Sequence, residues 1–282
     1  MTYTTLISTG ELAALATEPK VVVVDCRFVL DDVEWGQREY LAGHVPGAVY
    51  AHLDRDLSGR KDGTNGRHPL PDPEALLRTI AQLGISNDTQ VVAYDQDSGM
   101  YGSRLWWLLR WMGHDAVAVL DGGFAKWMAE GRATMLGDER NPRAEFSGVP
   151  SGDALVDADA VAMLSSDAAW RLVDARAPER FRGDIEPLDK VAGHIPGAVN
   201  YFYKDNLDEN GAWRKPEELR RMLDESIGDV RPDHVVCYCG SGVTACHNVL
   251  AFEHAGLRGA KLYAGSWSEW SSDPRRPVAV GE

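Results

Sequence analysis

The stretch AGHVPGAV (residues 42–49) returns almost unchanged as AGHIPGAV (residues 192–199), 150 positions later. Other blocks around it recur in the same order and at nearly the same spacing, so the chain contains one unit twice. These blocks are VDCR (24–27) and VDAR (173–176), PE (73–74 and 216–217), VVAYD (91–95) and VVCYC (235–239), and LDGGFAKW (120–127) and YAGSWSEW (263–270). Two long copies indicate the tandem duplication of a whole domain rather than a solenoid of short repeats.

Each copy alternates short apolar runs with amphipathic runs, a pattern typical of α/β domains with a mostly parallel sheet. The expected strands are 21–25, 91–94, 117–120, 171–174, 235–238 and 260–263. The expected helices are 8–16, which opens with a Ser8–Glu11 capping box, then 73–83, 101–112, 216–225 and 244–255. The weakly periodic segment 132–156 is predicted to link a domain at 1–145 to a domain at 146–282.

The composition of the 282 residues excludes several classes of protein. A net charge of −14 repels phosphate backbones and anionic lipids, so we expect neither nucleic acid nor membrane as a partner. No apolar run approaches the length of a membrane-spanning helix, and residues 1–20 show no Sec-type signal pattern. Four cysteines are too few for a disulfide framework in a chain of this size, so a reducing cytoplasm is the expected location.

Features that occur in both copies are expected to serve the fold. His44 and His194 could each be catalytic or bind a metal, but a site-forming role would have to occur twice. We therefore favour a turn whose histidine anchors a loop by hydrogen bonds. The same reasoning makes the Asp-x-Arg pairs that begin at Asp25 and Asp174 structural.

The two copies differ most where the middle strand ends. The first has DQDSGMYGS (95–103) and the second has CGSGVTACH (239–247), so Asp95 occupies the place of Cys239. Ligands of open parallel sheets bind beyond the carboxyl ends of strands. Two glycines and a serine allow the backbone after Cys239 to turn tightly, so that successive N–H groups form an anion-binding nest at a helix N-terminus. Such a nest stabilises a thiolate, which makes Cys239 the expected nucleophile.

Other roles for the cysteines have less support. Cys237 and Cys239 have no second Cys/His pair at a spacing that suits zinc, so no metal site is expected. Cys237 and Cys246 are expected to be packing residues, although a redox partnership between Cys246 and Cys239 stays open. A cysteine phosphatase needs an arginine six positions after the nucleophile, where this chain has Ala245. Chemistry on sulfur itself remains, with Cys239 carrying a transferred sulfur atom as a persulfide.

The tandem pattern, the GH[V/I]PGA turns and the closing motif AGSWSEW (264–270) resemble two-domain rhodanese-type sulfurtransferases over nearly the whole chain. In that family the first domain lacks the cysteine, as Asp95 opposite Cys239 repeats here. The loop CGSGVTA (239–245) is similar to that of 3-mercaptopyruvate sulfurtransferases, whereas thiosulfate-preferring rhodaneses usually carry Arg and Lys after the cysteine. The resemblance implies an α/β fold of tandem rhodanese-like domains, each a mostly parallel sheet flanked by helices.

The resemblance also implies roles for individual residues. The Ser-His-Asp relay of mercaptopyruvate enzymes matches Ser241, His68 and Asp54, which would place the active site at the interface of the two domains. Besides these, the substrate is expected to meet the backbone amides of the loop after the cysteine. The loop residues in question are Gly240, Gly242, Val243 and Thr244.

The segment that resembles the family's donor-binding region departs from the family pattern. Arg180 matches an arginine that binds the donor's carboxylate or the thiosulfate anion, and Arg182 is a weaker candidate. A second substrate arginine usually follows a Glu-Pro pair, but here residues 186–187 are followed by Leu188, Asp189 and Lys190. Lys190 could substitute, without the bidentate fork of arginine. Thiosulfate or another sulfane donor therefore stays open beside 3-mercaptopyruvate.

These observations together predict an enzyme that moves sulfur from 3-mercaptopyruvate or thiosulfate to a thiophilic acceptor through a Cys239 persulfide. The expected partners are a small-molecule donor and a thiol or thioredoxin-like acceptor, with cyanide or a dithiol as alternatives. No metal or organic cofactor is expected. The rival from another class is a non-enzymatic sulfur-relay or binding module, which an unreactive Cys239 would favour.

Overall fold

The computed structural model describes residues 2–15 and 18–281, and its contacts divide the chain into two compact units. The first unit contains the chain up to Gly59 together with 71–151 and 209–213. The second contains 60–70, 152–208 and the chain from Arg214 onward. Each unit therefore includes a short segment that the other repeat encodes, while the single boundary near residue 145 stays a prediction.

The first unit is built on a five-stranded, fully parallel sheet with the order β1-β5-β4-β2-β3. Its central strands are runs of β-branched residues that are buried on both faces, as expected of a parallel sheet covered by helices. The strands are β1 (Leu6–Ile7), β2 (Val21–Asp25), β3 (Val49–Tyr50), β4 (Gln90–Tyr94) and β5 (Val117–Leu120).

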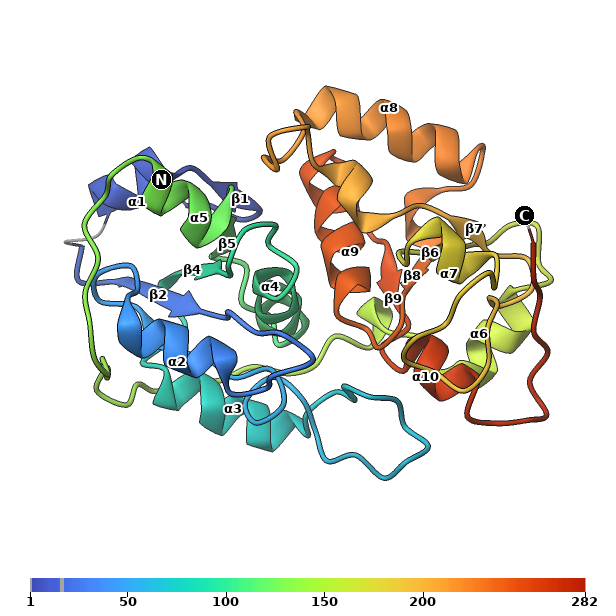
Figure 1. The fold of residues 1–282 in the computed structure, drawn as a ribbon, viewed down its shortest axis with the longest axis horizontal. Helices are drawn as coiled ribbons and strands as arrows, with labels where there is room; N and C mark the ends of the chain where they lie inside the picture. Colours follow the sequence, from blue (N-terminus) through green and yellow to red (C-terminus); the bar gives the residue numbers. More distant parts are fainter. Residues whose placement is uncertain (1, 16–17, 282) are drawn as a thin grey trace. The chain divides into compact units, whose positions relative to one another are not determined.

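Helices connect and cover these strands (Figure 1). They are α1 (Thr9–Leu15), α2 (Trp35–Ala42), α3 (Pro73–Gln82), α4 (Gly102–Trp111) and α5 (Gly123–Ala129). The expected capping box opens the first of them: the Ser8 N–H donates to Glu11 Oε2 at 2.9 Å, and the Glu11 N–H donates to Ser8 Oγ at 3.2 Å. Residue 16, the expected end of this helix, lies outside the described residues.

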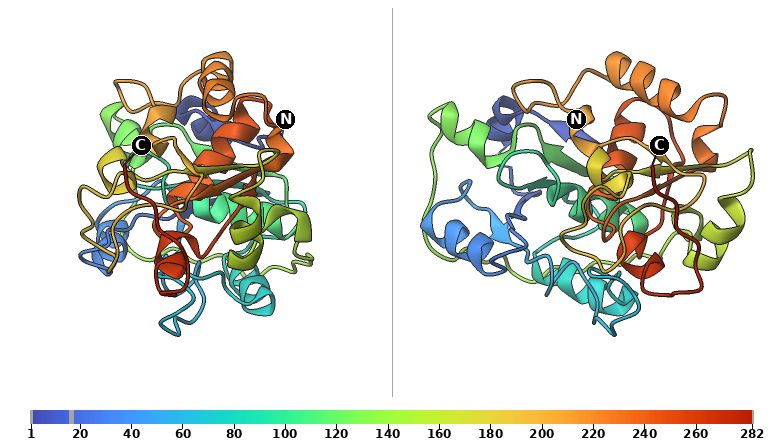
Figure 2. Two further views of the ribbon diagram at one scale, coloured as in Figure 1. Left: turned by 90° about the vertical axis from the view of Figure 1, so that its right-hand side faces the viewer. Right: turned by 45° about the vertical axis from the view of Figure 1, so that its right-hand side comes forward.

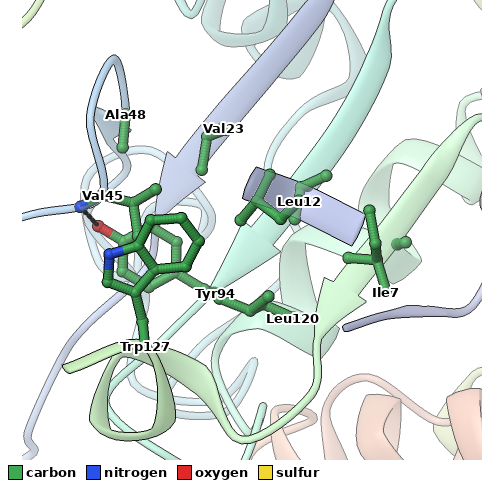
Figure 3. Close-up of a cluster of buried hydrophobic side chains, with 10 residues drawn as sticks. Ile7, Leu12, Val23, Val45, Ala48, Tyr94, Leu120 and Trp127 are labelled. Carbon is green, nitrogen blue, oxygen red and sulfur yellow. Dashed lines mark hydrogen bonds between the residues drawn. The ribbon is translucent and has the colours of Figure 1, made fainter. Parts of the chain in front are cut away.

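One cluster of the first unit's core lies between the sheet and the helices on one of its faces (Figure 3). Tyr94 reaches into it from β4, and its hydroxyl accepts a hydrogen bond from the Val45 N–H at 3.2 Å and donates one to Asp25 at 2.6 Å. A buried tyrosine needs such partners, because its hydroxyl would otherwise lose its hydration without compensation. Other members of the cluster are Ile7, Leu12, Val23, Ala48, Leu120 and Trp127.

The second unit repeats this plan with a four-stranded parallel sheet of order β7-β6-β8-β9, which matches β3-β2-β4-β5 of the first. Its strands are β6 (Arg171–Asp174), β7 (Val199–Asn200), β8 (Val235–Tyr238) and β9 (Lys261–Leu262). Its α-helices are α6 (Ala158–Leu164), α7 (Pro178–Phe181), α8 (Pro216–Ile227), α9 (Thr244–His254) and α10 (Ser266–Trp270). Short 3₁₀ turns lie at Gly152–Ala154, Tyr203–Asn206 and Pro232–His234. Figure 2 shows α8 beside α9, and these two helices pack against each other.

The two sheets confirm the α/β fold and the duplication. The predicted strands and long helices are found with described end points that match, as in β2 and β8, or differ by at most two residues, as in α8, which continues to Ile227. The sequence does not predict the elements that are too short to show a period, because a helix of two turns or a strand of two residues offers too few positions. The missed elements are β1, β3, β7, α2, α5, α6, α7 and α10. Across the described ranges, no helix is long and apolar enough to span a bilayer.

The histidines of the repeated turns anchor loops, as expected. His44 Nδ1 lies 2.8 Å from the Tyr40 carbonyl oxygen, and the two rings stack with centroids 4.3 Å apart. His194 Nδ1 lies 2.8 Å from the Phe181 carbonyl oxygen and stacks on that ring at 3.7 Å. Each residue also forms a bridge to a distant segment through its backbone. The two copies thus use the histidine in the same structural way.

The Asp-x-Arg pairs hold the same turns, because each arginine binds both its aspartate and a carbonyl oxygen of the turn. Arg27 donates to Asp25 at 2.7 Å and to the Gly43 carbonyl oxygen at 2.6 Å. Arg176 repeats this arrangement in the second unit, with Asp174 at 2.6 Å and the Gly193 carbonyl at 2.7 Å. These charges are buried, and such burial is tolerated only because each guanidinium is paired and hydrogen-bonded.

Candidate active site

Cys239 follows the last residue of β8 and has 2% of its surface exposed. Its N–H donates to Ser266 Oγ at 3.0 Å, and Ser266 Oγ in turn donates to the Tyr263 carbonyl at 2.9 Å. Its carbonyl accepts the Trp267 N–H at 2.9 Å. The repeated motif at 263–270 therefore holds the cysteine backbone from both sides and fixes where the thiol can lie.

The loop after the cysteine curls back onto the sulfur. The Gly242 N–H donates to Cys239 Sγ at 3.1 Å, and α9 begins two residues later. Gly242 has φ of +76°, and a Cβ atom on it would lie 2.2 Å from the Ala264 carbonyl oxygen, so only glycine fits. The sulfur of Cys239 therefore accepts a hydrogen bond from the backbone of its own loop.

Ser266 adopts φ of +56°, the one left-handed residue other than glycine in the part of the chain that the structure describes. The equivalent residue of the first copy is Gly123, with the same φ of +56°. The second copy thus accepts a strained backbone at this place and gains a hydroxyl that binds the N–H of the cysteine.

Two arginines lie against the loop. A Cβ atom on Gly240 would lie 2.7 Å from Arg67 Nη2, so this guanidinium occupies the space that a side chain at 240 would need; Arg180 Nη1 would lie 3.5 Å from the same atom, an ordinary contact distance. Arg180 comes from α7 and was expected here. Arg67 was not among the predicted site residues, although it directly precedes His68 in the sequence.

Carboxylates connect these arginines. Asp189 forms ion pairs with Arg67 and, at 3.3 Å, with Arg180. Glu186 pairs with Arg180 at 2.7 Å and with Arg176 at 3.4 Å. Burial by itself would raise the pKa of Glu186, but the hydrogen bonds from Arg180 and backbone amides outweigh it and lower this pKa. Glu186 therefore stays ionised and fixes Arg180.

His68 and Ser241 lie together, as the relay hypothesis requires. His68 Nδ1 is 2.8 Å from Ser241 Oγ, and both residues are buried. His68 belongs to the segment 60–70, which the first repeat encodes but which is part of the second unit. Asp54 belongs to the first unit, where its N–H donates to His52 Nδ1 at 3.0 Å, and its place in the relay stays a prediction.

Arg182 and Lys190, the other basic residues considered for donor binding, are not seen in contact with the loop after Cys239 in the described part of the chain. Arg182 pairs with Asp184 at 2.8 Å, and 38% of its side chain is exposed. Lys190, considered as a substitute for the missing second arginine, is exposed. Arg67 lies against Gly240, so the second guanidinium beside this glycine comes from the loop 60–70. The family pattern had suggested the segment that follows the Glu-Pro pair at 186–187.

In the first unit, the loop 95–103 is equivalent to 239–247, and it encloses a carboxylate. The Asp95 carboxylate accepts the N–H groups of Gly99 at 2.9 Å, Tyr101 at 2.6 Å and Gly102 at 3.2 Å. The first copy therefore fills its own cradle with a side-chain carboxylate. Burial raises the pKa of Asp95 to about 6, although the three amides act in the opposite direction. The backbone of this loop is thus suited to bind an anion.

The remaining cysteines are buried and free of disulfide bonds. The Cys246 thiol donates to the Gly242 carbonyl oxygen at 3.2 Å, and the N–H of the same glycine donates to Cys239 Sγ. Burial raises the pKa of the Cys237 thiol, which disfavours a reactive thiolate there. Among the residues that the structure describes, no group of three or more potential ligands is placed to hold a metal ion.

Comparison with known proteins gives a consistent picture. The rhodanese-like domain model matches residues 8–130 and 157–273. The chain is 46% identical to a protein of Pseudomonas aeruginosa named probable 3-mercaptopyruvate sulfurtransferase, with both chains covered completely, and 34% identical to the thiosulfate sulfurtransferase of Bos taurus, over 95% of this chain and 92% of that protein. The structure of 3-mercaptopyruvate sulfurtransferase from Leishmania major superposes with a TM-score of 0.85 at 30% identity, covering 97% of this chain and 76% of that chain.

Both copies match the family model, and the similarity to the curated relatives extends over nearly the full length of the chain and includes the second copy with its Cys239 loop. The chain therefore belongs to the rhodanese-like family, as a two-domain enzyme of the sulfurtransferase type.

Proposed function

We propose that the protein moves the sulfur atom of 3-mercaptopyruvate to a thiophilic acceptor, and that Cys239 carries this atom as the sulfane sulfur of a persulfide. The observation that carries this proposal is the Gly242 N–H directed at Cys239 Sγ, within a loop that two guanidinium groups flank. This arrangement suits a thiolate nucleophile and an anionic donor at the same place.

In the first half-reaction, the Cys239 thiolate attacks the thiol sulfur of the donor. An S–S bond forms, the donor's C–S bond breaks, and its electron pair leaves on the pyruvate enolate. That enolate takes up one proton to become pyruvate, and Cys239 holds the extra sulfur as a persulfide. Amides of the loop, of which Gly242 is the one in contact with sulfur, stabilise the anionic charge on this path.

The proton for the enolate is assigned to Ser241 and His68. Their hydrogen bond of 2.8 Å allows Ser241 to give up a proton and recover it from His68. Asp54 is proposed to complete the relay, as the family resemblance implies. The donor's carboxylate is proposed to bind Arg180, and the backbone of Gly240, Gly242, Val243 and Thr244 would line the donor and the leaving group.

In the second half-reaction, a thiophile attacks the outer sulfur and regenerates the Cys239 thiolate. A thiol acceptor, such as a dithiol or a thioredoxin-like protein, would take the sulfur as its own persulfide, and cyanide would leave as thiocyanate. A cytoplasmic location, in which the four cysteines stay reduced, fits this cycle and stays a prediction.

The test is sulfur loading of the purified protein. After treatment with 3-mercaptopyruvate, mass spectrometry should show one added sulfur atom on the peptide that contains Cys239, and pyruvate should form in equal amount. The Cys239→Ser variant should lose turnover by at least about a thousandfold, because the hydroxyl is a far weaker nucleophile, while its thermal midpoint stays close to that of the wild type. Sulfur on another cysteine, or full turnover by Cys239→Ser, would contradict the proposal.

Thiosulfate is the alternative donor, and the bovine relative bears that name. With thiosulfate, the same thiolate attacks the outer sulfur and sulfite leaves. Specificity constants for the two donors, measured with one common acceptor, decide between them. A protein that forms no persulfide with either donor would instead act as a binding module.

A further inference from the structure

We propose that a surface beside the Cys239 loop docks a small acidic protein that presents a thiol, and that this protein takes the sulfur from the Cys239 persulfide. This inference rests on the proposed function and adds to it the kind of acceptor and the place where it binds. The surface consists of exposed aliphatic side chains of the segments 185–191 and 278–280, together with exposed cations next to them.

The exposed apolar side chains of the second unit gather in two segments. Among its described residues, six large apolar side chains are exposed, and five of them lie in these segments. These five, which we call the aliphatic rim, are Ile185, Leu188, Val191, Val278 and Val280. The sixth, Met163, belongs to α6. A group of exposed apolar side chains is typical of a place where another protein binds.

The two segments of the aliphatic rim lie side by side. The backbones of His194 and Ala279 form an antiparallel bridge. A Cβ atom on Gly193 would lie 2.9 Å from Val278 Cγ1 and 3.1 Å from Val280 Cγ1. The C-terminal segment therefore packs against the chain directly after Val191, and the aliphatic side chains form one surface.

The aliphatic rim adjoins the loop of the candidate nucleophile. The Trp267 indole N–H donates to the Val191 carbonyl oxygen at 2.9 Å, and the backbone N–H of Trp267 donates to the Cys239 carbonyl oxygen at 2.9 Å. Within the same segment, Asp189 pairs with Arg67, whose guanidinium lies against the Cys239 loop. A protein that binds the aliphatic rim would therefore have its own surface close to the Cys239 sulfur.

Exposed cations without an ion-pair partner among the described residues border the aliphatic rim. One is Lys190, which lies between two members of the rim, and the other is Arg60 of the loop 60–70. The nearby acids are engaged, since Asp184 pairs with Arg182 and Asp62 accepts two backbone N–H groups of its own loop. Because the whole chain has a net charge of −14, these cations would direct an acidic partner to this surface and not to others.

A thiol carried by a protein needs a docking surface here, because Cys239 is only 2% exposed. In the transfer step, the acceptor's thiolate attacks the outer sulfur of the persulfide and a new S–S bond forms. The S–S bond to Cys239 breaks, Cys239 leaves as a thiolate, and the acceptor holds the persulfide. The acceptor must dissociate after each turnover, and a small apolar surface suits such a transient contact.

The test compares a protein acceptor with a small one, at saturating 3-mercaptopyruvate. The protein probe is a reduced thioredoxin whose net charge is negative, and cyanide is the acceptor that needs no docking surface. We expect Ile185→Asp/Val280→Asp to raise the KM for thioredoxin about tenfold or more, because the new charges oppose both apolar contact and an acidic partner. The KM for cyanide should stay within about twofold of the wild type. Met163→Asp places the same charge on an exposed apolar residue of the same unit and should change neither constant.

Arg60→Glu separates the effect of charge from that of apolar contact, and it keeps the proposal testable should the double variant fail to fold. It should raise the KM for thioredoxin severalfold at low ionic strength and leave the KM for cyanide unchanged. Added salt should reduce the difference from the wild type, because it screens exposed charges. Arg258→Glu, the same change at an exposed arginine between α9 and β9, is the control.

The possible failures can be told apart. Equal KM values for thioredoxin in the rim variants and their controls would overturn the docking surface and leave sulfur transfer intact. A wild-type persulfide that reacts with cyanide but not with thioredoxin would do the same. Self-association of the wild type that Ile185→Asp/Val280→Asp abolishes, measured by analytical ultracentrifugation, would assign the aliphatic rim to a second copy of this chain. Absence of a persulfide in the wild type would overturn the proposed function itself.

Discussion

At the scale of single residues, the second copy differs from the first by a few side chains at equivalent backbone positions. Cys239 replaces Asp95, and Ser266 replaces Gly123 at the same φ of +56°. The left-handed conformation costs a residue with a Cβ atom about 1–2 kcal/mol, and the hydroxyl of Ser266 compensates by accepting the N–H of Cys239. Local strain is thus located beside the candidate nucleophile.

This strain predicts an unusual order of stabilities at position 266. Ser266→Ala loses the hydroxyl and keeps the strain, whereas Ser266→Gly loses the hydroxyl and relieves the strain. We therefore expect Ser266→Gly to have a free energy of unfolding about 1 kcal/mol higher than Ser266→Ala, measured by chemical denaturation. Both variants should react more slowly at Cys239, whose N–H they leave without its partner. An alanine variant as stable as the glycine variant would show that the φ angle costs little here.

At the scale of elements, the loop between a middle strand and its following helix holds an acidic side chain in the first copy and the candidate nucleophile in the second. In the first unit this loop encloses the Asp95 carboxylate, and in the second it encloses the Cys239 sulfur. The same backbone therefore serves as an internally filled anion cradle in one copy and as a candidate reaction site in the other. The Asp95 carboxyl group in the first cradle is fully buried, so its protonation affects the free energy of unfolding.

We expect the buried carboxyl of Asp95 to make folding stability pH-dependent. Its pKa of about 6 in the folded state lies above the ordinary 3.8, so the folded protein retains a proton that the unfolded chain releases. The stabilisation from this proton is complete below pH 4 and is lost as the pH rises to about 6, a decrease of up to about 3 kcal/mol. Urea denaturation of the wild type and of Asp95→Asn, measured between pH 4 and pH 6, should show this decrease in the free energy of unfolding only for the wild type.

Asp97→Asn is the matched control for this prediction. Asp97 is exposed and lies two residues further along the same loop. The Asp97 charge is a minor cause of the raised pKa of Asp95, so Asp97→Asn should reduce the pH dependence only slightly, whereas Asp95→Asn should abolish this component. Parallel stability curves for the wild type and Asp95→Asn would mean that the loop amides compensate fully for the burial of Asp95.

At the scale of the whole molecule, the duplicated halves have exchanged short segments. The loop 60–70, encoded by the first repeat, is part of the second unit and carries Arg67 and His68. The segment 209–213, encoded by the second repeat, is part of the first unit, where the Trp213 N–H donates to Asp121 at 2.9 Å. The candidate site therefore needs residues of both repeats, although its described contacts lie in one unit.

His68→Ala tests whether this exchanged segment takes part in proton transfer. The pyruvate enolate must be protonated and sulfite need not be, so we expect kcat/KM for 3-mercaptopyruvate to fall about a hundredfold or more and that for thiosulfate to fall much less. The pH profile for 3-mercaptopyruvate should lose the limb that belongs to the histidine. His234→Ala, a change of a partly buried histidine in the same unit whose Nδ1 lies 3.1 Å from the Ala169 carbonyl oxygen, is the control. Equal losses with both donors would remove the relay from the mechanism.

The sequence by itself determined the duplication, the fold class and the candidate nucleophile. These features depend on local information: repeated blocks, buried apolar runs such as 235–238, and a glycine-rich turn after Cys239. The contact of His68 with Ser241 was expected only through the family resemblance, because nothing local relates residues so far apart in the chain.

Only the tertiary structure decided which cations surround the loop. Arg67 lies far from Cys239 and Asp189 in the sequence, and no periodicity or turn signal brings them together. Their meeting depends on the fit of Gly66 against the Gly265 carbonyl and on the ion pair with Asp189. Long-range packing and electrostatic pairing, rather than local preference, determine this part of the site.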